Sequence, residues 1–268
     1  MILNRLLFNS VLQEILEDLG RTRLFQLTPV ECRLPGAATP NPELQRHGGN
    51  LPAVVRYMQQ HHADAWKATL KAMHGIVPGL TGIETAFTTN RRLTLLFHER
   101  GARAWSSDEV SDGTIQSLAL FTCLFDPRVP LALIEEPENS VHPWIVKTFV
   151  DACRHATGKQ LLVTTHSPAL ISYLTPSELA ILWRTRDGRT HLAPLKDLDP
   201  HAPKLVGKSS ESCAASPFHA RSFHDARMAA RGPDYFGSRA TWICMNSLMA
   251  AGSASPSPSG CSEGRGRR

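Results

Sequence analysis

Apolar runs that alternate with helical patterns constrain the fold of this chain more than any other feature. Residues 131–134 and 160–165 are apolar runs of strand length, and residues 141–156 between them repeat apolar side chains at helical spacing. Strands that are apolar on both faces need cover on both faces, which is typical of a parallel sheet flanked by helices. The pattern therefore predicts an α/β fold with a mostly parallel sheet.

The remaining elements follow from weaker patterns. Apolar residues at three-and-four spacing predict helices, strand-like runs on either side of Asn90 and Arg91 predict a β-hairpin, and proline with glycine marks a loop. The expected elements are a helix over 2–19, a strand over 24–27, a loop over 34–50, helices over 51–60 and 64–74, hairpin strands over 82–89 and 92–98, a helix over 168–173, and strands over 179–183 and 190–193 that pair.

The patterning stops beyond about residue 200. Residues 201–268 are rich in Ser, Gly and Pro, a composition that buries too little apolar surface to offset the entropy of ordering, so we expect a mostly disordered tail. This stretch holds nine Lys and Arg against four Asp and Glu, so the net charge of +5 belongs to it and residues 1–200 are neutral. The basic pI near 9.0 is therefore poor evidence that the folded part binds nucleic acid.

A Ser-x-Gly turn, Ser111-Asp112-Gly113, followed by Thr114, opens the helix that we expect over residues 115–125. The start of a helix presents unpaired backbone N–H groups and the positive end of the helix dipole, which together suit a terminal phosphate. Ser and Asp also begin ordinary helices. This segment alone is therefore compatible with a plain helix cap.

Two adjacent acids, Glu135 and Glu136, end the apolar run 131–134, and Pro137 then breaks the strand. Ligands bind beyond the carboxyl ends of parallel strands. Neighbouring strand residues point to opposite sides, so one carboxylate can hold Mg²⁺ while the other orients or deprotonates water. The alternative is a solvated acidic turn after a core strand.

A histidine, His166, ends the second buried strand and is followed by Ser167-Pro168, which predicts a helix start. An imidazole at that place can contact a γ-phosphate. The alternative is a loop histidine beside an ordinary helix cap.

Taken together and in order, these segments resemble the ABC-type ATPases, and within them the RecF/SMC-like AAA ATPases of bacterial repair and defence systems. The signature motif stands here as SDGT (111–114), the Walker B strand as IEEPENSVHP (134–143) and the switch strand as TTHSP (164–168). The stretches RHGGNLPAV (46–54) and IVPGL (76–80) are similar to the helical insert that precedes the signature. The resemblance implies a P-loop-NTPase-like sheet with flanking helices.

The resemblance also implies a role for the residues at the strand ends, with ATP and Mg²⁺ as ligands. Glu135 would hold Mg²⁺ where most ABC proteins have Asp, so its carboxylate reaches about one methylene further. Glu136 would be the catalytic base or the acid that orients water. His166 would be the switch histidine.

Further residues of the motifs would meet a partner. The signature residues would contact the γ-phosphate of ATP held by a second subunit, in a head-to-head dimer; they are Ser111, Asp112, Gly113 and Thr114. The stretch after Walker B would form the dimer contact through Glu138, Asn139 and His142. Asn139 could equally form a turn, and His142 could equally start the helix before Pro143.

One motif of the family is absent from the sequence, because no G-x-x-x-x-G-K-[ST] occurs in it. Such a P-loop supplies nested backbone N–H groups and a lysine for the phosphates of ATP. The resemblance covers about residues 24–197, and we expect that the N-terminal strands and P-loop of the head are not in this chain. A start codon placed too far downstream or a disrupted gene would have that effect. The patternless stretch after residue 200 is compatible either with a change of reading frame or with a natural disordered tail.

The chain is thereby divided into a helical insert with a hairpin over 1–109, an α/β core over 110–198, and a tail over 199–268. No apolar run reaches the roughly 18 residues of a membrane helix, and we expect a cytoplasmic protein.

We hold two hypotheses: an ATPase acting with DNA or a nuclease effector, and a non-hydrolysing module that donates its signature face to a P-loop-bearing partner. A Toprim-linked nuclease of the OLD type is less favoured, since no acidic cluster follows residue 170.

The missing P-loop predicts that the chain by itself has negligible ATPase activity, because the acids at positions 135 and 136 have no phosphate cradle beside them. Steady-state phosphate release by the purified chain with Mg²⁺ and ATP measures this. Turnover on the order of 1 per second, an ordinary enzyme rate, would refute the argument.

Overall fold

The computed structural model describes residues 16–17, 19–156, 158–184, 189–198 and 241–245. They form a six-stranded sheet in the order β1-β5-β6-β9-β7-β8 and a three-stranded sheet in the order β2-β3-β4. The helix expected over 2–19 lies outside the described residues except for its last turn, where residues 16, 17, 19 and 20 are helical. Within the described residues, no helix combines the length and hydropathy needed to cross a bilayer.

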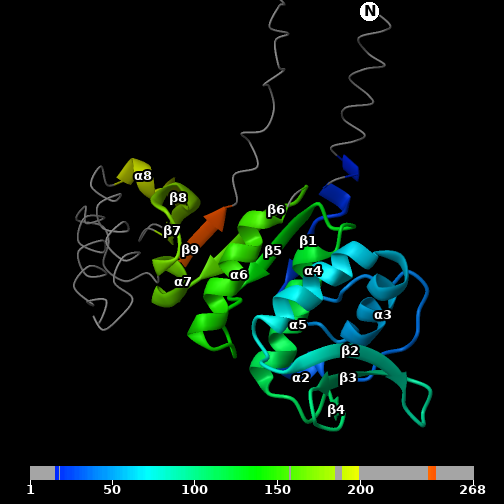
Figure 1. Ribbon diagram of the computed structural model, residues 1–268. Coiled ribbons are helices and arrows are strands. Elements are labelled where there is room, and N and C mark those ends of the chain that lie inside the picture. The colour runs from blue at the N-terminus through cyan, green and yellow to red at the C-terminus, as the bar shows by residue number, and fades with distance from the viewer. Residues whose placement is uncertain (1–15, 18, 157, 185–188, 199–240, 246–268) are drawn as a thin grey trace, which may run out of the picture.

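The parallel part of the large sheet consists of β1 (Arg23–Phe25), β5 (Leu131–Glu135) and β6 (Gln160–Thr165), as Figure 1 shows. Phe25 pairs with Ile134, and Ile134 pairs with Val163, so the three strands are in step near their carboxyl ends. Ala132, Ile134, Leu161 and Val163 are all buried. The predicted strands are confirmed, and their ends share one edge of the sheet. Burial alternates along both strands, with Leu131, Leu133 and Leu162 partly exposed, so within the described residues the cover that we expected on both faces is complete on one face only.

The other three strands are β7 (Leu179–Arg184), β8 (Thr190–Pro194) and β9 (Thr241–Met245). The predicted pairing of residues 179–183 with 190–193 is confirmed as the antiparallel pair β7 and β8. Strand β9 lies between β6 and β7 and runs antiparallel to both. It comes from the stretch that we expected to be disordered, so that expectation is wrong for these five residues. The rest of the tail, residues 199–240 and 246–268, lies outside the described residues.

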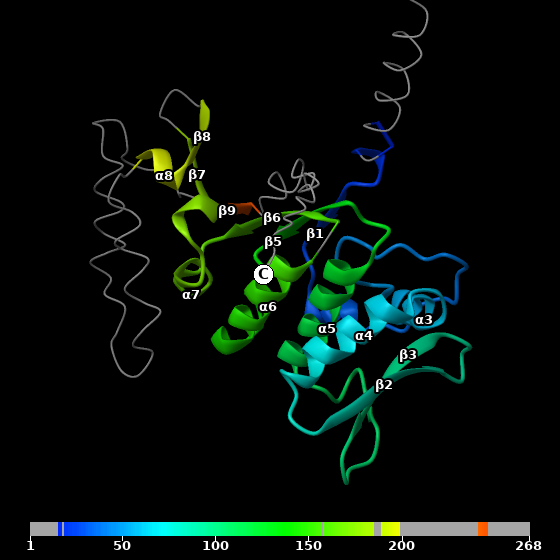
Figure 2. The same ribbon diagram turned by 45° about the horizontal axis from the view of Figure 1, so that its top comes forward.

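Two helices, α5 (Asp112–Phe125) and α6 (Pro143–His155), lie side by side against one face of the large sheet (Figures 1 and 2). Every residue of α5 from 115 to 124 is buried, because the helix is covered by α6 on one flank and by the N-terminal helices on the other. Helix α6 buries only one stripe, Ile145, Val146, Phe149 and Val150. The short helices α7 (Pro168–Ser172), η1 (Pro176–Glu178) and α8 (Leu195–Leu198) accompany β7 and β8.

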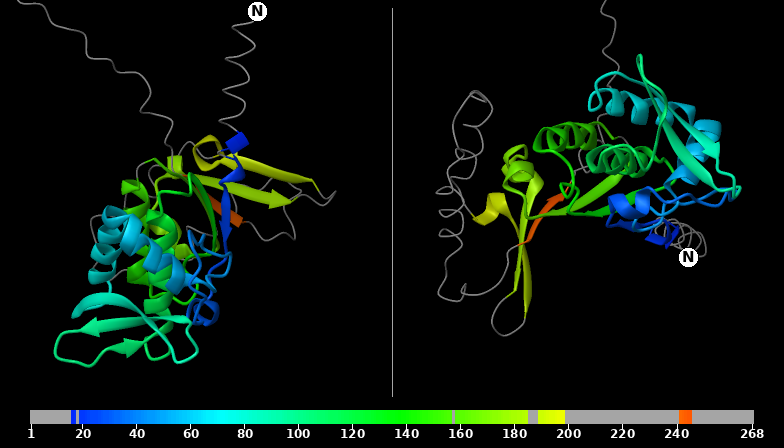
Figure 3. Two further views of the ribbon diagram at one scale, coloured as in Figure 1. Left: turned by 90° about the vertical axis from the view of Figure 1, so that its right-hand side faces the viewer. Right: turned by 90° about the horizontal axis from the view of Figure 1, so that it is seen from below.

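A second layer consists of α3 (Leu51–His61), α4 (Ala63–His74) and the small sheet of β2 (Leu80–Phe87), β3 (Leu93–Glu99) and β4 (Trp105–Ser106). Figure 3 shows it at the end of the molecule away from β7 and β8. The predicted helices and hairpin are confirmed, and α4 packs on α5, so both layers share one core. A four-residue helix, α2 (Pro29–Cys32), was not predicted.

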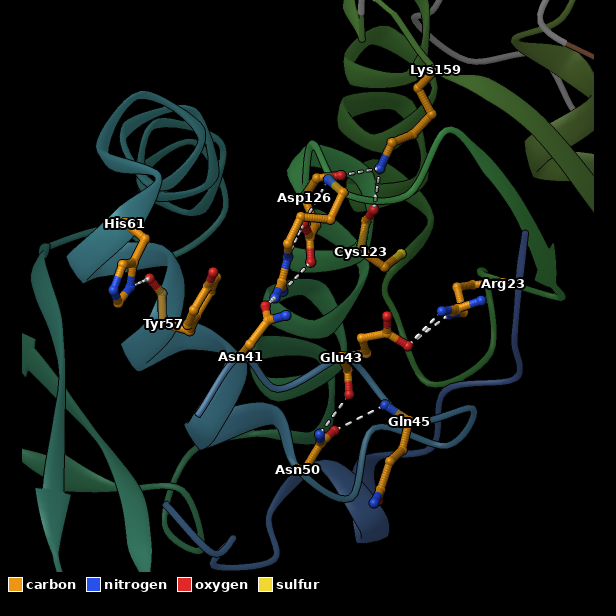
Figure 4. A network of polar contacts seen from close by, with 11 residues as sticks. Arg23, Asn41, Glu43, Gln45, Asn50, Tyr57, His61, Cys123, Asp126 and Lys159 are labelled. Carbon is orange, nitrogen blue, oxygen red and sulfur yellow. Dashed lines mark hydrogen bonds and ion pairs between the residues drawn. The ribbon is translucent and has the colours of Figure 1, made fainter. Parts of the chain in front are cut away.

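A buried amine closes the far end of α5. Lys159, just before β6, is only 4% exposed, and its Nζ donates to the backbone carbonyls of Cys123 (2.7 Å) and Asp126 (2.8 Å), as seen in Figure 4. Burial lowers the pKa of this amine. The contacts satisfy carbonyls that the end of a helix leaves unpaired, and they fasten α5 to the start of β6.

The loop before α3 comes close to the segment after β1. The backbone N–H of Gln26 donates to Arg46 O (2.9 Å), and that of Thr28 donates to His47 O (3.3 Å). Gly48 follows with φ +87°, and a Cβ on it would lie 2.3 Å from the Sγ of buried Cys32. Only glycine fits here, on grounds of both backbone and space.

We predict that Gly48→Ala destabilises the protein more than Gly79→Ala does. Gly79 has φ +88° but no atom within 4 Å of an added Cβ, so its substitution adds only left-handed strain, about 1–2 kcal/mol. Gly48→Ala adds the clash with Cys32, worth a further loss of about 1–3 kcal/mol. Urea unfolding of both variants measures the difference, and equal losses would contradict the close packing of Gly48.

Candidate functional site

The ends of β5 and β6 bring the two predicted acids and the predicted histidine together. Glu135 pairs with Thr164, and the backbone N–H of Glu136 donates to Thr164 O at 2.9 Å, which extends the parallel ladder one residue past β5. His166 follows β6 directly. The Oε1 of Glu136 lies 3.7 Å from the Nε2 of His166, and both side chains are a little under half exposed.

The backbone turns sharply at Glu136. Its φ is 45°, in the left-handed region that non-glycine residues rarely adopt, and Ser140 in the same turn has φ 65°. Such conformations cost energy and occur often at functional sites. The turn is closed by Asn139, whose backbone N–H donates to Glu136 O (3.1 Å) and whose Nδ2 donates to Glu136 Oε2 (2.8 Å). One carboxylate oxygen of Glu136 is thereby fixed, and the other faces His166.

Glu138 points inward and joins the turn after β5 to the end of β6. Its Oε1 accepts from the hydroxyl of Thr165 at 2.5 Å and from the backbone N–H of His166 at 3.3 Å. Its Oε2 is buried and, among the residues that the structure describes, has no hydrogen-bond partner. Glu138 therefore sets the position of the His166 backbone from within the same chain.

A third strand adds two residues that the sequence analysis missed. Gln26 follows β1 directly, and its Oε1 accepts from Arg46 Nη2 at 3.2 Å. The same nitrogen lies 3.6 Å from Glu135 Oε2. The sequence analysis placed Gln26 inside a strand over 24–27, whereas the strand ends at Phe25, so the amide was not recognised as a strand-end residue. Nothing in the sequence showed that the loop carrying Arg46 returns to this edge.

The predicted signature residues form the start of α5. Ser111 is its N-cap, with Oγ accepting from the backbone N–H of Thr114 at 3.2 Å and lying 2.9 Å from the Thr114 hydroxyl. Arg33 holds the approach to the helix by pairing with Asp112 and donating to Val110 O at 2.8 Å. The plain-cap interpretation is thus realised.

The signature turn and the turn after β5 are neighbours. A Cβ on Gly113 would lie 3.4 Å from Ser140 O and about 4 Å from Val141 Cα. Among the described residues, no hydrogen bond or ion pair joins Ser111 to the acids or to His166. The structure therefore places the signature residues beside the Glu136–His166 group, with the turn between them.

The stretch after the predicted Walker B strand has local roles in the structure. His142 is the N-cap of α6, and its Nδ1 accepts from the backbone N–H of Trp144 at 3.5 Å, with Pro143 at the first helical position. Asn139 forms the turn, as described above. Both alternatives that the sequence left open are realised, while a contact of Glu138, Asn139 and His142 with a second subunit stays a prediction.

Oxygen ligands at this edge fit Mg²⁺ only in part. In the described part of the chain, no three His, Cys, Asp or Glu side chains gather closely enough to form a metal site by themselves. The Glu135 carboxylate and the Gln26 amide oxygen both lie around the same Arg46 nitrogen, so a cation is already accepted between them. Mg²⁺ is commonly held by one or two carboxylates together with water and substrate phosphates, and this donor set suits that mode.

Comparison with known protein families gives one match. A family model with the description "AAA domain, putative AbiEii toxin, Type IV TA system" matches residues 9–172. This range includes all three motifs and more than half of the chain. No curated protein matches the sequence.

Several solved structures are similar at low identity. One, described under "ATP-driven dimerization and DNA stimulated activation of SMC ATPases", is 15% identical with a TM-score of 0.43, covering 60% of this chain and 99% of that chain. The SmcHead bound to the C-winged helix domain of ScpA is 16% identical with a TM-score of 0.41, covering 51% of this chain and 43% of that one. The Smc head domain from Pyrococcus yayanosii is 14% identical with a TM-score of 0.39, covering 58% and 31%. Likeness at this level says nothing of substrates or partners.

Proposed function

The chain belongs to this family of AAA domains, and from that premise we propose that it supplies the hydrolytic edge of an ABC-type ATPase head of the RecF/SMC kind. The observation that carries the proposal is the convergence of Glu135, Glu136 and His166 at the carboxyl ends of two parallel strands. Phosphate ligands of α/β proteins bind at such an edge.

In this proposal Glu136 is the general base. Asn139 fixes one oxygen of its carboxylate at 2.8 Å and leaves the other toward His166. That free oxygen can accept a proton from water as the water attacks the γ-phosphate. His166 lies within 3.7 Å of it and can donate to a phosphate oxygen or hold the same water.

Glu135 and Gln26 would hold Mg²⁺ in the proposed site. A bound Mg²⁺ neutralises the negative charge of the β- and γ-phosphates. Arg46 lies between the two side chains and has to turn away for a metal to bind both oxygens. Its side chain is about half exposed, so solvent gives it room to do so.

The signature residues would serve a second nucleotide. Ser111, Asp112, Gly113 and Thr114 would contact ATP bound by a partner, in a head-to-head dimer or with a P-loop-bearing subunit, and Glu138, Asn139 and His142 would line that contact. We extend the proposal to DNA or a nuclease effector as the target of hydrolysis, in repair or defence, on the strength of the three sequence motifs alone.

A second candidate is a non-hydrolysing module that only donates the signature face. The observation that favours it is at the start of α5, where Arg33 donates to the Val110 carbonyl and pairs with Asp112. These contacts order the start of the helix without any nucleotide. The two candidates differ in whether Glu135 and Glu136 are used.

We predict that Mn²⁺, as a probe for Mg²⁺, binds this chain at Glu135. Glu135→Gln should weaken that binding about tenfold or more, and Arg46→Gln should strengthen it because the competing cation is gone. Electron paramagnetic resonance of free Mn²⁺ measures the affinities. Glu99→Gln, on strand β3, removes the same charge away from the site and should leave binding unchanged. Equal affinities of wild type and Glu135→Gln would remove the metal from the proposal.

In an assembly that provides a P-loop, Glu136→Gln should abolish turnover while ATP stays bound. The amide oxygen of Gln can still accept the hydrogen bond from Asn139, but the amide cannot take a proton from water. Phosphate release together with retention of labelled ATP on a filter measures both. Full turnover in this variant would support the non-hydrolysing module instead.

A further inference from the structure

A cleft of about 400 Å³ lies between α3 and the loop over residues 38–41, away from the edge that carries Glu135 and Glu136. Clefts of this size hold small organic ligands. The loop and α3 contribute most of the lining, and Leu93 of β3 completes it. Its lining residues are Ala38, Thr39, Pro40, Asn41, Ala53, Arg56, Tyr57, Gln60, His61 and Leu93.

Three polar residues of α3 line this cleft without hydrogen-bond or ion-pair partners among the described residues. Among the described residues, neither the guanidinium of Arg56, the hydroxyl of Tyr57 nor the amide of Gln60 takes part in a hydrogen bond or ion pair. All three residues line the cleft, and polar groups without hydrogen-bond partners there can bind a ligand without breaking existing hydrogen bonds. This arrangement is what a preformed binding site requires.

Aromatic contacts hold two of these side chains, Arg56 and Tyr57, in place. The Cζ of Arg56 lies 5.2 Å from the centroid of the Phe87 ring. The rings of Tyr57 and His61 are stacked at 4.3 Å, and the Cζ of Arg128 lies 4.4 Å from the Tyr57 centroid. Figure 4 shows Tyr57 and His61 beside Asn41, whose Oδ1 accepts from Arg128 at 2.9 Å. Little side-chain entropy is therefore left to lose on binding.

The charge of the cleft favours an anion. No Asp or Glu is among its lining residues, and Arg56 is a full positive charge there. Both acids of the network in Figure 4 are already paired, Asp126 with Arg128 at 2.6 Å and Glu43 with Arg23 at 2.5 Å. A guanidinium is well suited to a phosphate because it offers paired N–H donors to two oxygens.

We propose that this cleft binds a nucleoside monophosphate. Arg56 holds the phosphate, Tyr57 and His61 border the planar base, and the amides of Gln60 and Asn41 bond to the sugar or the base edge. One guanidinium matches one phosphate group. The same unit could be supplied by a free nucleotide or by one residue of a single-stranded oligonucleotide, which share this chemistry.

The test is isothermal titration of the full chain with AMP in the presence of EDTA, so that no metal-dependent binding contributes. Wild type should bind, and Arg56→Gln should bind about tenfold more weakly. Arg100→Gln removes the same charge at an exposed arginine outside the cleft and should bind as wild type does. Tyr57→Phe keeps the ring stack, removes the hydroxyl, and should weaken binding as well. Glu135→Gln should have no effect, which separates this site from the proposed ATPase site.

A second arm replaces AMP with a short oligothymidylate. Tighter binding of the oligonucleotide that is also lost in Arg56→Gln would support the cleft and identify nucleic acid as the source of the nucleotide. Absence of binding by both probes, or equal binding by wild type and Arg56→Gln, would overturn the proposal. Thermal melting of each variant confirms that a lost signal is not lost folding.

Discussion

The candidate site depends on one constraint, the parallel pairing of β5 with β6 in a fixed register. Because parallel strands end at the same edge, the pairing of Glu135 with Thr164 places Glu136 and His166 side by side. A slip of one residue would turn the side chains of β5 to the opposite face and separate the carboxylate from the imidazole. The burial of Ile134 and Val163 between sheet and helices is what prevents such a slip.

Hydrogen bonds from nearby residues then fix the positions of Glu136 and His166, which the strand register brings together. Asn139 fixes the Glu136 carboxylate from the turn, and Glu138 reaches across to the backbone of His166. The free energy for the strained turn, with Glu136 at φ 45°, comes from the surrounding packing rather than from the turn itself. The acids and the imidazole are therefore positioned by residues between them in sequence, within one chain.

The sequence predicted those parts of the fold that local pattern determines. Strand β6 was found because its residues form an apolar run of strand length, and helix α3 because its apolar residues repeat at helical spacing. Helix α2 has four residues, too few for a period, and β9 belongs to a stretch whose composition is typical of disorder, so its place in the sheet depends on long-range pairing. Glu135, Glu136 and His166 were placed correctly at one edge, whereas Arg46 was missed because its loop is positioned by contacts with the segment after β1.

Helix α5 is anchored at both ends. At its start, Arg33 donates to the Val110 carbonyl, and at its end the Nζ of Lys159 donates to the carbonyls of Cys123 and Asp126. The two ends of the helix are therefore tied to segments that lie far apart in the sequence, so the position of α5 relative to the sheet depends on both sets of hydrogen bonds together.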